Sequence, residues 1–202
     1  MGSSTTEPSL EGLAREARRG SKAAFGRLAE RLQEPLYNFL FLRTRNAADA
    51  EELAQEAFLR AWLRIATYDE RWRFSTWLFA VARNLAVSHH RSAGARPAPA
   101  ASLEDLGTGD VDPARDLARS ELRRGLWDLA ARVLSEEQRD ALWLRYAEDL
   151  PPLEIARILG RRPSTIRVLL FRARGRLAEH LARAEPGSAS LPVPIKIAGD
   201  PR

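Results

Sequence analysis

The chain of 202 residues contains no cysteine, and its only histidines are His89, His90 and His180. Without cysteine the protein can form neither a disulfide nor a thiolate metal site, and we expect it to reside in a reducing cytoplasm. His89 and His90 are adjacent and point to different faces of a helix, so they make a poor metal-binding pair. A glycine-rich phosphate loop and a nucleophile motif are also absent from the sequence. We therefore expect no enzymatic activity, no metal site and no cofactor.

Long apolar runs are missing as well. No stretch approaches the roughly 18 apolar residues of a membrane-spanning helix, and the N-terminus lacks the layout of a signal peptide. We expect no membrane insertion. A hydrophobic content of 45% and a charged content of 29% are typical of a soluble globular protein. The isoelectric point near 10.3 favours a polyanionic partner.

Helical patterns fill two stretches of the chain, residues 10–92 and 114–184, and no β-hairpin signal appears. The segment between them, 93–113, is rich in alanine, proline, glycine and acidic residues, which is typical of a flexible linker. Residues 1–9 form a polar leader that we expect to be disordered, and 185–202 form a proline-containing tail that we expect to be flexible. The sequence therefore predicts an all-α protein of two small helical domains joined by a flexible acidic linker.

The C-terminal domain contains well-defined helix boundaries. Ser135 and Gln138 have the spacing of a capping box and predict a helix that ends near Asp149. Pro152 suits the first turn of a second, short helix, and Gly160 suits its end.

A third helix begins at Pro163 and carries apolar residues at intervals of four, three, four and four: Ile166, Leu170, Ala173, Leu177 and Leu181. A short helix, a glycine-containing turn and a longer helix form a helix-turn-helix, which places its second helix in the DNA major groove. From Arg157 to Arg176 the chain has no acidic residue and seven arginines, the one-sided charge balance that a phosphate-binding surface requires. They are residues 157, 161, 162, 167, 172, 174 and 176.

A strong helix is also predicted over residues 49–62. Its buried stripe is expected to consist of Ala50, Ala54, Ala57, Phe58, Ala61 and Ile65. Three carboxylates and two leucines fall on the opposite face: Asp49, Glu52, Glu56, Leu59 and Leu63. Leucines in register with acidic side chains indicate a binding face for a basic, partly apolar partner.

Two sets of motifs resemble a known family. The sequence DAEELAQEAFL at 49–59, with FSTWLFAVARNLA at 74–86, resembles conserved region 2 of the extracytoplasmic-function (ECF) sigma factors of the sigma-70 family. Glu154-Ile155-Ala156, Thr165-Ile166-Arg167 and Arg172-Ala173-Arg174 resemble region 4 of the same family. The motifs occur in the family's order, with a linker between them.

The resemblance covers roughly residues 20–92 and 120–182 and implies a sigma factor that binds core RNA polymerase and directs transcription initiation from promoter DNA. It also implies that an anti-sigma factor is a candidate partner. In this family the acidic helix docks on the polymerase. The implied polymerase contacts are Asp49, Glu52, Gln55, Glu56 and Leu59.

The next segment resembles the part of region 2 that reads the −10 promoter element. Promoter opening requires a surface for an unstacked base and a basic groove for a separated strand. From Arg71 to Arg96 the chain has five arginines, interleaved with aromatic residues, and no carboxylate. We expect Trp77 to belong to the core, and the candidate DNA contacts are Trp72, Arg73, Phe74, Arg83 and Asn84.

The recognition helix departs from the family pattern, which often has Lys-Ser-Arg-Leu where this chain has Arg167-Val168-Leu169-Leu170. Val168 and Phe171 project from the outer face, where apolar groups read thymine methyls or contact a protein. The candidate contacts to the −35 element are Ser164, Thr165, Arg167, Val168, Phe171, Arg172 and Arg174.

Two alternatives remain open at this point. A helix-turn-helix regulator with a helical sensor domain would bind its operator without polymerase. A polymerase-binding adaptor would have lost −35 recognition through Val168 and Leu169.

Overall fold

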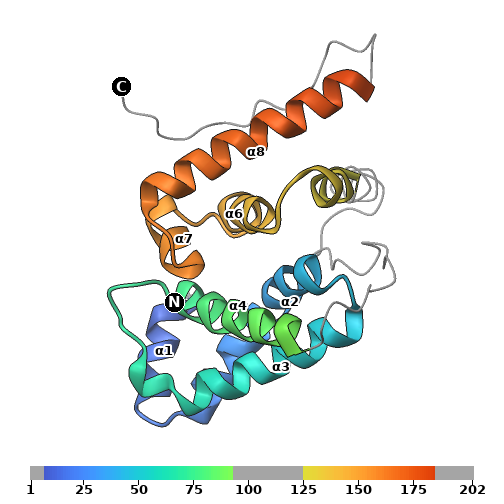
Figure 1. Cartoon of the computed structure of the whole chain (residues 1–202). Coiled ribbons are helices and arrows are strands. Elements are labelled where there is room, and N and C mark those ends of the chain that lie inside the picture. Colours follow the sequence, from blue (N-terminus) through green and yellow to red (C-terminus); the bar gives the residue numbers. More distant parts are fainter. Residues whose placement is uncertain (1–6, 93–124, 185–202) are drawn as a thin grey trace, which may run out of the picture.

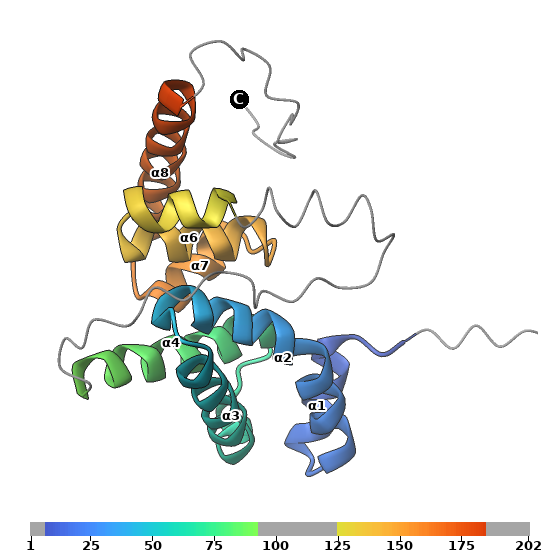
Figure 2. The same cartoon turned by 90° about the vertical axis from the view of Figure 1, so that its right-hand side faces the viewer.

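The computed structural model describes residues 7–92 and 125–184, and in these two ranges the chain forms helices and no strand. The fold of the described residues is all-α, as predicted. Figures 1 and 2 show the helices in two groups, with α7 lying against α4 where the groups meet.

The first group, which we call the N-module, covers residues 10–92. Its elements are α1 (Leu10–Arg18), α2 (Lys22–Thr44), α3 (Ala47–Leu63), the 3-10 helix η1 (Ile65–Thr67) and α4 (Phe74–Ser92). The first three helices each begin at a polar N-cap whose side chain accepts a backbone N–H bond, a standard helix start signal. These caps are Ser9, Ser21 and Asn46.

Aromatic side chains fill the core of the N-module. Phe39 of α2 meets Phe79 of α4 edge-on, with ring centroids 5.2 Å apart. Tyr68, which follows η1, meets Phe74 at the start of α4 in the same geometry, at 5.4 Å. Edge-to-face pairs of this kind stabilise beyond their buried area, and these two join α4 to the rest of the bundle.

The second group, the C-module, covers residues 125–184. It consists of a helical segment at 125–133, α6 (Glu136–Tyr146), α7 (Pro152–Leu159) and α8 (Pro163–Ala184). Ser135 and Gln138 form the predicted capping box at the start of α6. Gly160 ends α7 with φ of 63°, a left-handed conformation that glycine adopts without strain. The predicted helix-turn-helix is therefore confirmed in its helices and its turn.

The apolar stripe of α8 faces α6 and α7. Ile166, Leu170 and Ala173 are buried, and Leu177 packs against them at the edge. In the N-module, four alanines and Ile65 of the stripe predicted for residues 49–65 are buried, and Phe58 packs against them partly exposed. The predicted linker, 93–113, lies outside the described residues, as do the leader up to residue 6 and the tail.

None of the described helices is both long and apolar enough to cross a membrane. Within the same residues no cluster of histidine, aspartate and glutamate has the arrangement of a metal site.

Candidate functional site

The acidic helix α3 presents its polar side to solvent, as predicted. The side chain of Asn46 caps the helix by accepting N–H bonds from Ala48 and Asp49. Asp49 stands in the first turn, where the helix dipole favours a negative charge. Glu52, Gln55 and Leu59 are exposed, and Glu56 is half-buried. The five implied polymerase contacts thus lie together on one side of α3, which we call the α3 face.

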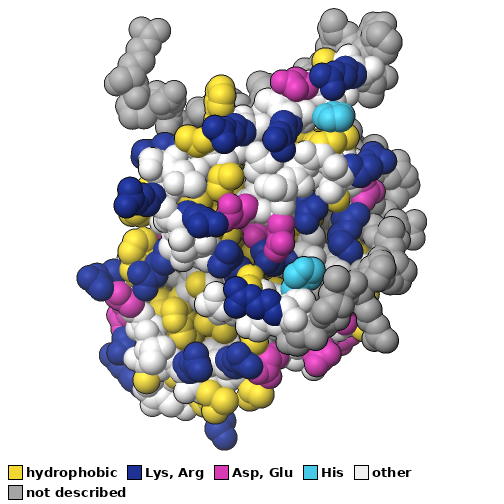
Figure 3. All heavy atoms as spheres, in the orientation of Figure 1, with side chains coloured by type: hydrophobic (Ala, Val, Ile, Leu, Met, Phe, Trp, Pro, Cys, Tyr) yellow, Lys and Arg dark blue, Asp and Glu magenta, His cyan; other side chains and the backbone are white. Residues whose placement is uncertain are grey.

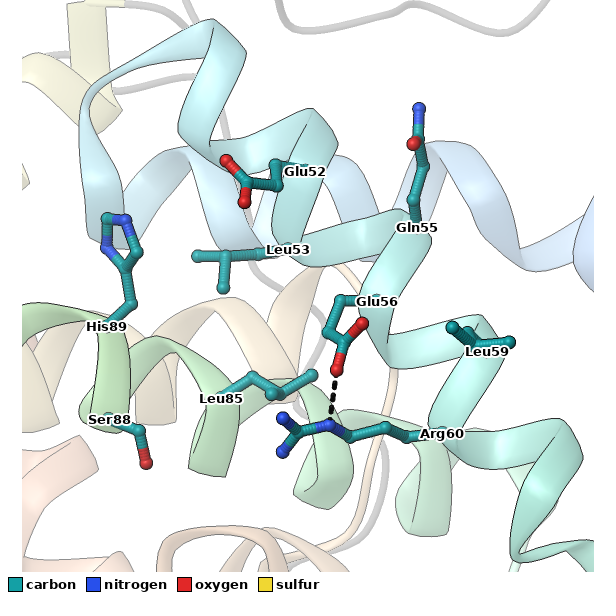
Figure 4. Close-up of a pocket in the computed structure, with 9 residues that line it drawn as sticks. All are labelled: Glu52, Leu53, Gln55, Glu56, Leu59, Arg60, Leu85, Ser88 and His89. Carbon is teal, nitrogen blue, oxygen red and sulfur yellow. Dashed lines mark hydrogen bonds and ion pairs between the residues drawn. The ribbon is translucent and has the colours of Figure 1, made fainter.

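A groove runs between this face and α4. Its lining consists of Glu52, Leu53, Gln55, Glu56, Leu59, Arg60, Leu85, Ser88 and His89 (Figure 4). Leu53 and Leu85 are almost fully buried and form an apolar floor between the two helices. Glu56 accepts a 2.6 Å bond from Arg60 Nε, which holds its carboxylate at the rim.

Two large apolar side chains of α3 are exposed near the groove: Leu59 in its lining and Leu63 one helical turn further along α3. Leu59 is 53% exposed and Leu63 is 72% exposed. Leucines that remain open beside carboxylates favour a partner that is both basic and partly apolar. The sequence predicted these two leucines but missed Leu53 and Leu85. Their burial depends on the packing of α3 against α4, which the period of one helix does not reveal.

The second candidate surface is the turn of residues 68–73, between η1 and α4. Its conformation is fixed from within: Tyr68 donates a 2.8 Å hydrogen bond to the carbonyl of Trp72. Asp69 accepts bonds from both the backbone and the guanidinium of Arg71, and these bonds lower the pKa of Asp69 to about 2. The turn is therefore a preformed loop that positions Trp72 and Arg73.

Phe74 is a correction to the sequence prediction. The side chain is fully buried, edge-on to Tyr68 and 5.7 Å from Trp77 between ring centroids. It anchors the first turn of α4 in the core and does not reach a surface where DNA could contact it. Trp77 is partly buried against the same core, in agreement with the prediction.

The remaining candidates for the −10 element lie in two environments. Trp72 is half-buried, and Arg73 is exposed but pairs with Glu154 of α7 at 3.4 Å. Arg83 is half-buried, and among the described residues its Nε has no hydrogen-bond partner. Asn84 is exposed on α4. Trp72 and Arg73 thus sit together in the turn, while Arg83 and Asn84 lie about three helical turns further along α4.

The third candidate surface is the outer face of α8. All seven residues predicted to contact the −35 element are exposed: Ser164, Thr165, Arg167, Val168, Phe171, Arg172 and Arg174. Phe171 is 71% exposed and Val168 is 45% exposed. In the part of the chain that the structure describes, the three arginines of this set form no ion pair. Figure 3 shows basic side chains, all of them arginines, spread along α8 on the face seen in Figure 1.

Three arginines of the helix-turn-helix have partners that the sequence did not indicate. Arg161 pairs with Glu137 of α6 at 2.6 Å, and Arg176 donates to Gln138 Oε1 at 3.3 Å. Arg157 lies over the ring of Trp72. The sequence predicted seven uncompensated arginines, but these three have partners, so fewer arginines are available to bind phosphates.

Comparison with known families gives two matches in order along the chain. Residues 28–96 match the model of Sigma-70 region 2, and residues 119–177 match that of Sigma-70, region 4. The ECF RNA polymerase sigma factor BldN of Streptomyces coelicolor is 33% identical over 88% of this chain and 66% of its own length. The ECF RNA polymerase sigma-E factor of Haemophilus influenzae is 32% identical over 81% of this chain and 90% of its own.

A further relative, the probable RNA polymerase sigma factor RfaY of Xanthomonas campestris, is 32% identical, and the match spans 80% of this chain and 41% of RfaY. Two solved structures have a similar fold. CnrH in complex with the cytosolic domain of CnrY gives a TM-score of 0.65 at 23% identity, covering 87% of this chain and 98% of that one. RpoE of Bartonella quintana, in complex with the anti-sigma factor NepR, gives 0.63 at 22%, covering 80% and 98%.

Proposed function

The chain belongs to the ECF sigma factors of the sigma-70 family, and we propose that it binds core RNA polymerase and directs transcription initiation at promoters with a −10 and a −35 element. The observation that supports this most is the presence of two different surfaces on one chain. The α3 face combines exposed leucines with carboxylates, and the phosphates of DNA would repel those carboxylates. The outer face of α8 combines exposed arginines with a helix-turn-helix, which DNA attracts.

In this proposal the α3 face is the polymerase contact. Asp49, Glu52 and Glu56 supply negative charge for a basic partner surface, and Leu59 supplies apolar area at its centre. Electrostatic complementarity of this kind raises the association rate and selects the partner, whereas Leu59 adds apolar contact area that becomes buried only when the partner binds.

The turn of residues 68–73 and α4 are proposed to handle the −10 element. The half-buried indole of Trp72 offers a ring on which an unstacked base can stack, and Arg73 offers a charge for the adjacent phosphate. Arg83 and Asn84 are proposed to contact the separated strand further along α4. Single-strand contacts suit this position because promoter opening exposes bases that duplex DNA keeps paired.

The outer face of α8 is proposed to read the −35 element in the major groove. Arg167 lies near the N-terminal end of the helix, which enters the groove first, and is the proposed base reader. Arg172 and Arg174 are proposed to bind backbone phosphates on either side of the major groove. Val168 and Phe171 are proposed to contact thymine methyl groups.

Core RNA polymerase and promoter DNA are the proposed partners, and the cytoplasm is the proposed location. One solved relative of similar fold is described in complex with an anti-sigma factor, NepR. We propose a protein of this class as a further partner, because exposed apolar groups such as Phe171 suit a protein contact as well as a thymine methyl.

The decisive experiment is reconstituted transcription. Purified chain and core RNA polymerase are mixed with sheared genomic DNA of the source organism, and the RNA 5′ ends are mapped. The proposal predicts start sites that share two short upstream motifs and that vanish when either protein is omitted. A helix-turn-helix regulator would instead bind specific DNA without polymerase and give no start sites. An adaptor would bind polymerase without generating start sites that share a −35 motif.

A further inference from the structure

One basic surface of the N-module has no part in the polymerase and promoter contacts proposed above. It lies where α1 ends and α2 begins and consists of four exposed residues, which we call the basic end: Arg15, Arg18, Arg19 and Lys22. Figures 1 and 2 show the connection between α1 and α2 at the lower edge of the molecule, on the side away from the C-module. A partner can therefore reach the basic end from solvent.

The protein itself compensates the charges of the basic end poorly. In the described stretch from Leu10 to Lys22, Glu16 is the one exposed carboxylate. Arg15 and Arg19 lie one helical turn apart, a spacing at which like charges repel, and neither forms an ion pair with a described residue. The dipole of α1 stabilises cations in its last turn, but that of α2 disfavours Lys22, its first residue. An anionic partner would offset both unfavourable effects.

The basic end adjoins the turn of residues 68–73, which we call the −10 turn. Arg18 Nη1 donates to Glu70 Oε1 at 2.5 Å, and α1 packs against η1, which precedes the turn. Burial raises the pKa of Tyr68, the first residue of the turn, to about 12, and the nearby charge of Arg15 opposes that rise. The −10 turn therefore runs from the basic end on one side to the start of α4 on the other (Figure 1).

This position places the basic end on the path of promoter DNA. The C-module, whose α8 is proposed to read the −35 element, lies beside α4, and the basic end lies on the other side of the −10 turn. A strand that comes from the −35 element, passes α4 and stacks a base on Trp72 is therefore directed along the turn towards α1. Its next nucleotides lie between the −10 element and the transcription start. Arginine and lysine bind the phosphates of such a strand without reading its sequence.

We propose that the basic end binds backbone phosphates of the separated DNA strand between the −10 element and the transcription start. Arg15, Arg19 and Lys22 make the phosphate contacts, and the ion pair between Arg18 and Glu70 holds the end of α1 against the turn. The contact adds affinity for the opened promoter without changing which promoter is chosen. This inference rests on the proposed role of the −10 turn, but its phosphate contacts are also tested without polymerase.

The first test measures how the binding of single-stranded DNA depends on salt. The probe is a fluorescent 20-nucleotide DNA of mixed sequence, and the variant is the full chain with Arg15→Ala and Arg19→Ala. Each phosphate contact to a single strand contributes about 0.7 to the slope of log affinity against log salt, so the loss of two contacts should reduce the slope by about 1.4. The matched control, Arg132→Ala with Arg183→Ala, removes the same charge at two exposed positions of the C-module and should leave the slope unchanged.

The second test locates the DNA. Because the chain has no cysteine, Ala23→Cys supplies a single attachment site at an exposed position next to Lys22. An iron chelate attached there generates hydroxyl radicals that cleave nearby DNA, in a complex with core RNA polymerase and a promoter found by mapping RNA 5′ ends. We expect cuts in one strand between the −10 element and the transcription start. The same chelate at Ala178→Cys, an exposed position of α8, is the control and should leave that segment uncut.

The proposal is overturned if the Arg15→Ala, Arg19→Ala variant and its control have the same salt slope, or if the chelate at Ala23→Cys leaves the segment uncut in a complex that transcribes. It is also overturned if the double variant binds DNA normally and loses affinity for core polymerase, because the basic end would then be a protein contact. Should the double variant fail to fold, as judged by circular dichroism, Arg15→Gln with Arg19→Gln removes the same charge and keeps longer side chains. Failure of the proposed function would appear separately, as a lack of binding between the unmodified chain and core polymerase.

Discussion

The two surfaces proposed to contact promoter DNA differ in how they are presented. On α8 the outer face is open along its length, and its arginines 167, 172 and 174 have no ion-pair partner among the described residues. At the −10 turn Trp72 lies under Arg157, and Arg73 pairs with Glu154. The open surface depends on contacts within one module, and the covered one depends on contacts between modules. Arginines with the same chemistry are therefore accessible to DNA on α8 but paired at the −10 turn, because a helix of the other module packs only against the turn.

The largest expected effect is on stability, and it distinguishes the core residue Phe74 from Trp72, a proposed DNA contact close to it in the chain. Phe74→Ala should destabilise the N-module by about 3–5 kcal/mol, because it removes a fully buried aromatic side chain. Trp72→Ala should cost far less stability, since its indole is only half-buried. Urea unfolding followed by circular dichroism measures both. A stable Phe74→Ala protein would return Phe74 to the list of surface candidates.

The next effect concerns the α3 face, the proposed contact for core polymerase. The double variant Glu52→Lys, Glu56→Lys should weaken binding to core polymerase by roughly 30-fold, or about 2 kcal/mol, because it sets like charges against a basic partner. Its control is Glu30→Lys, Glu34→Lys, which makes the same change at exposed positions of α2. Fluorescence titration with core polymerase measures both affinities. Equal affinities in two folded proteins would remove the α3 face from the mechanism.

A third effect distinguishes the arginines of α8 from one another. Arg167→Ala should cost about 1–3 kcal/mol at the preferred −35 sequence and relax the preference at one base. Arg172→Ala should weaken binding to all sequences about equally and reduce the salt slope by about one. Binding of the polymerase complex to promoter libraries at several salt concentrations gives both quantities. Two indistinguishable profiles would mean that Arg167 contacts only phosphate.

The smallest effect is a pH dependence confined to the C-module. Burial raises the pKa of Glu148 to about 7, against the lowering effect of the hydrogen bond that Trp143 Nε1 donates to it. Because the folded state binds this proton more tightly than the unfolded state, the C-module should lose stability as pH rises from about 4.5 through 7.

Glu148→Gln mimics the protonated form and keeps an oxygen that can accept from Trp143. It should raise the melting temperature at pH 8 by a few degrees and flatten its pH dependence, as measured by differential scanning calorimetry. An unchanged pH profile would show that Glu148 does not titrate in this range.

The helix-turn-helix illustrates what the sequence could predict. The capping box of Ser135 and Gln138, the left-handed Gly160 and the stripe from Ile166 to Ala173 are local signals, and each fixes a helix end or a buried face. The α3 face was predictable for the same reason, since alanines at helical spacing leave the carboxylates on the other side. Local periodicity was sufficient wherever the burying partner was another helix of the same module.

The −10 turn illustrates what the sequence could not predict. Phe74 sits among polar and basic residues, and its burial follows from Tyr68, which packs on it from the other end of the turn. Glu154 reaches Thr76 across 78 positions, and Arg43 reaches Asp140 across 97. Pairings between modules leave no periodic pattern in either segment, so the covering of Trp72 by Arg157 required the three-dimensional arrangement.

The most direct test of this account is transcription by core RNA polymerase from a promoter identified by mapping RNA 5′ ends, with the unmodified chain, the Glu52→Lys, Glu56→Lys variant and the Arg167→Ala variant. The account predicts a specific transcript with the unmodified chain, a loss of that transcript at limiting polymerase with the α3 variant, and a weaker transcript at this promoter with Arg167→Ala. An unmodified chain that binds core polymerase and gives no specific transcript would contradict the account.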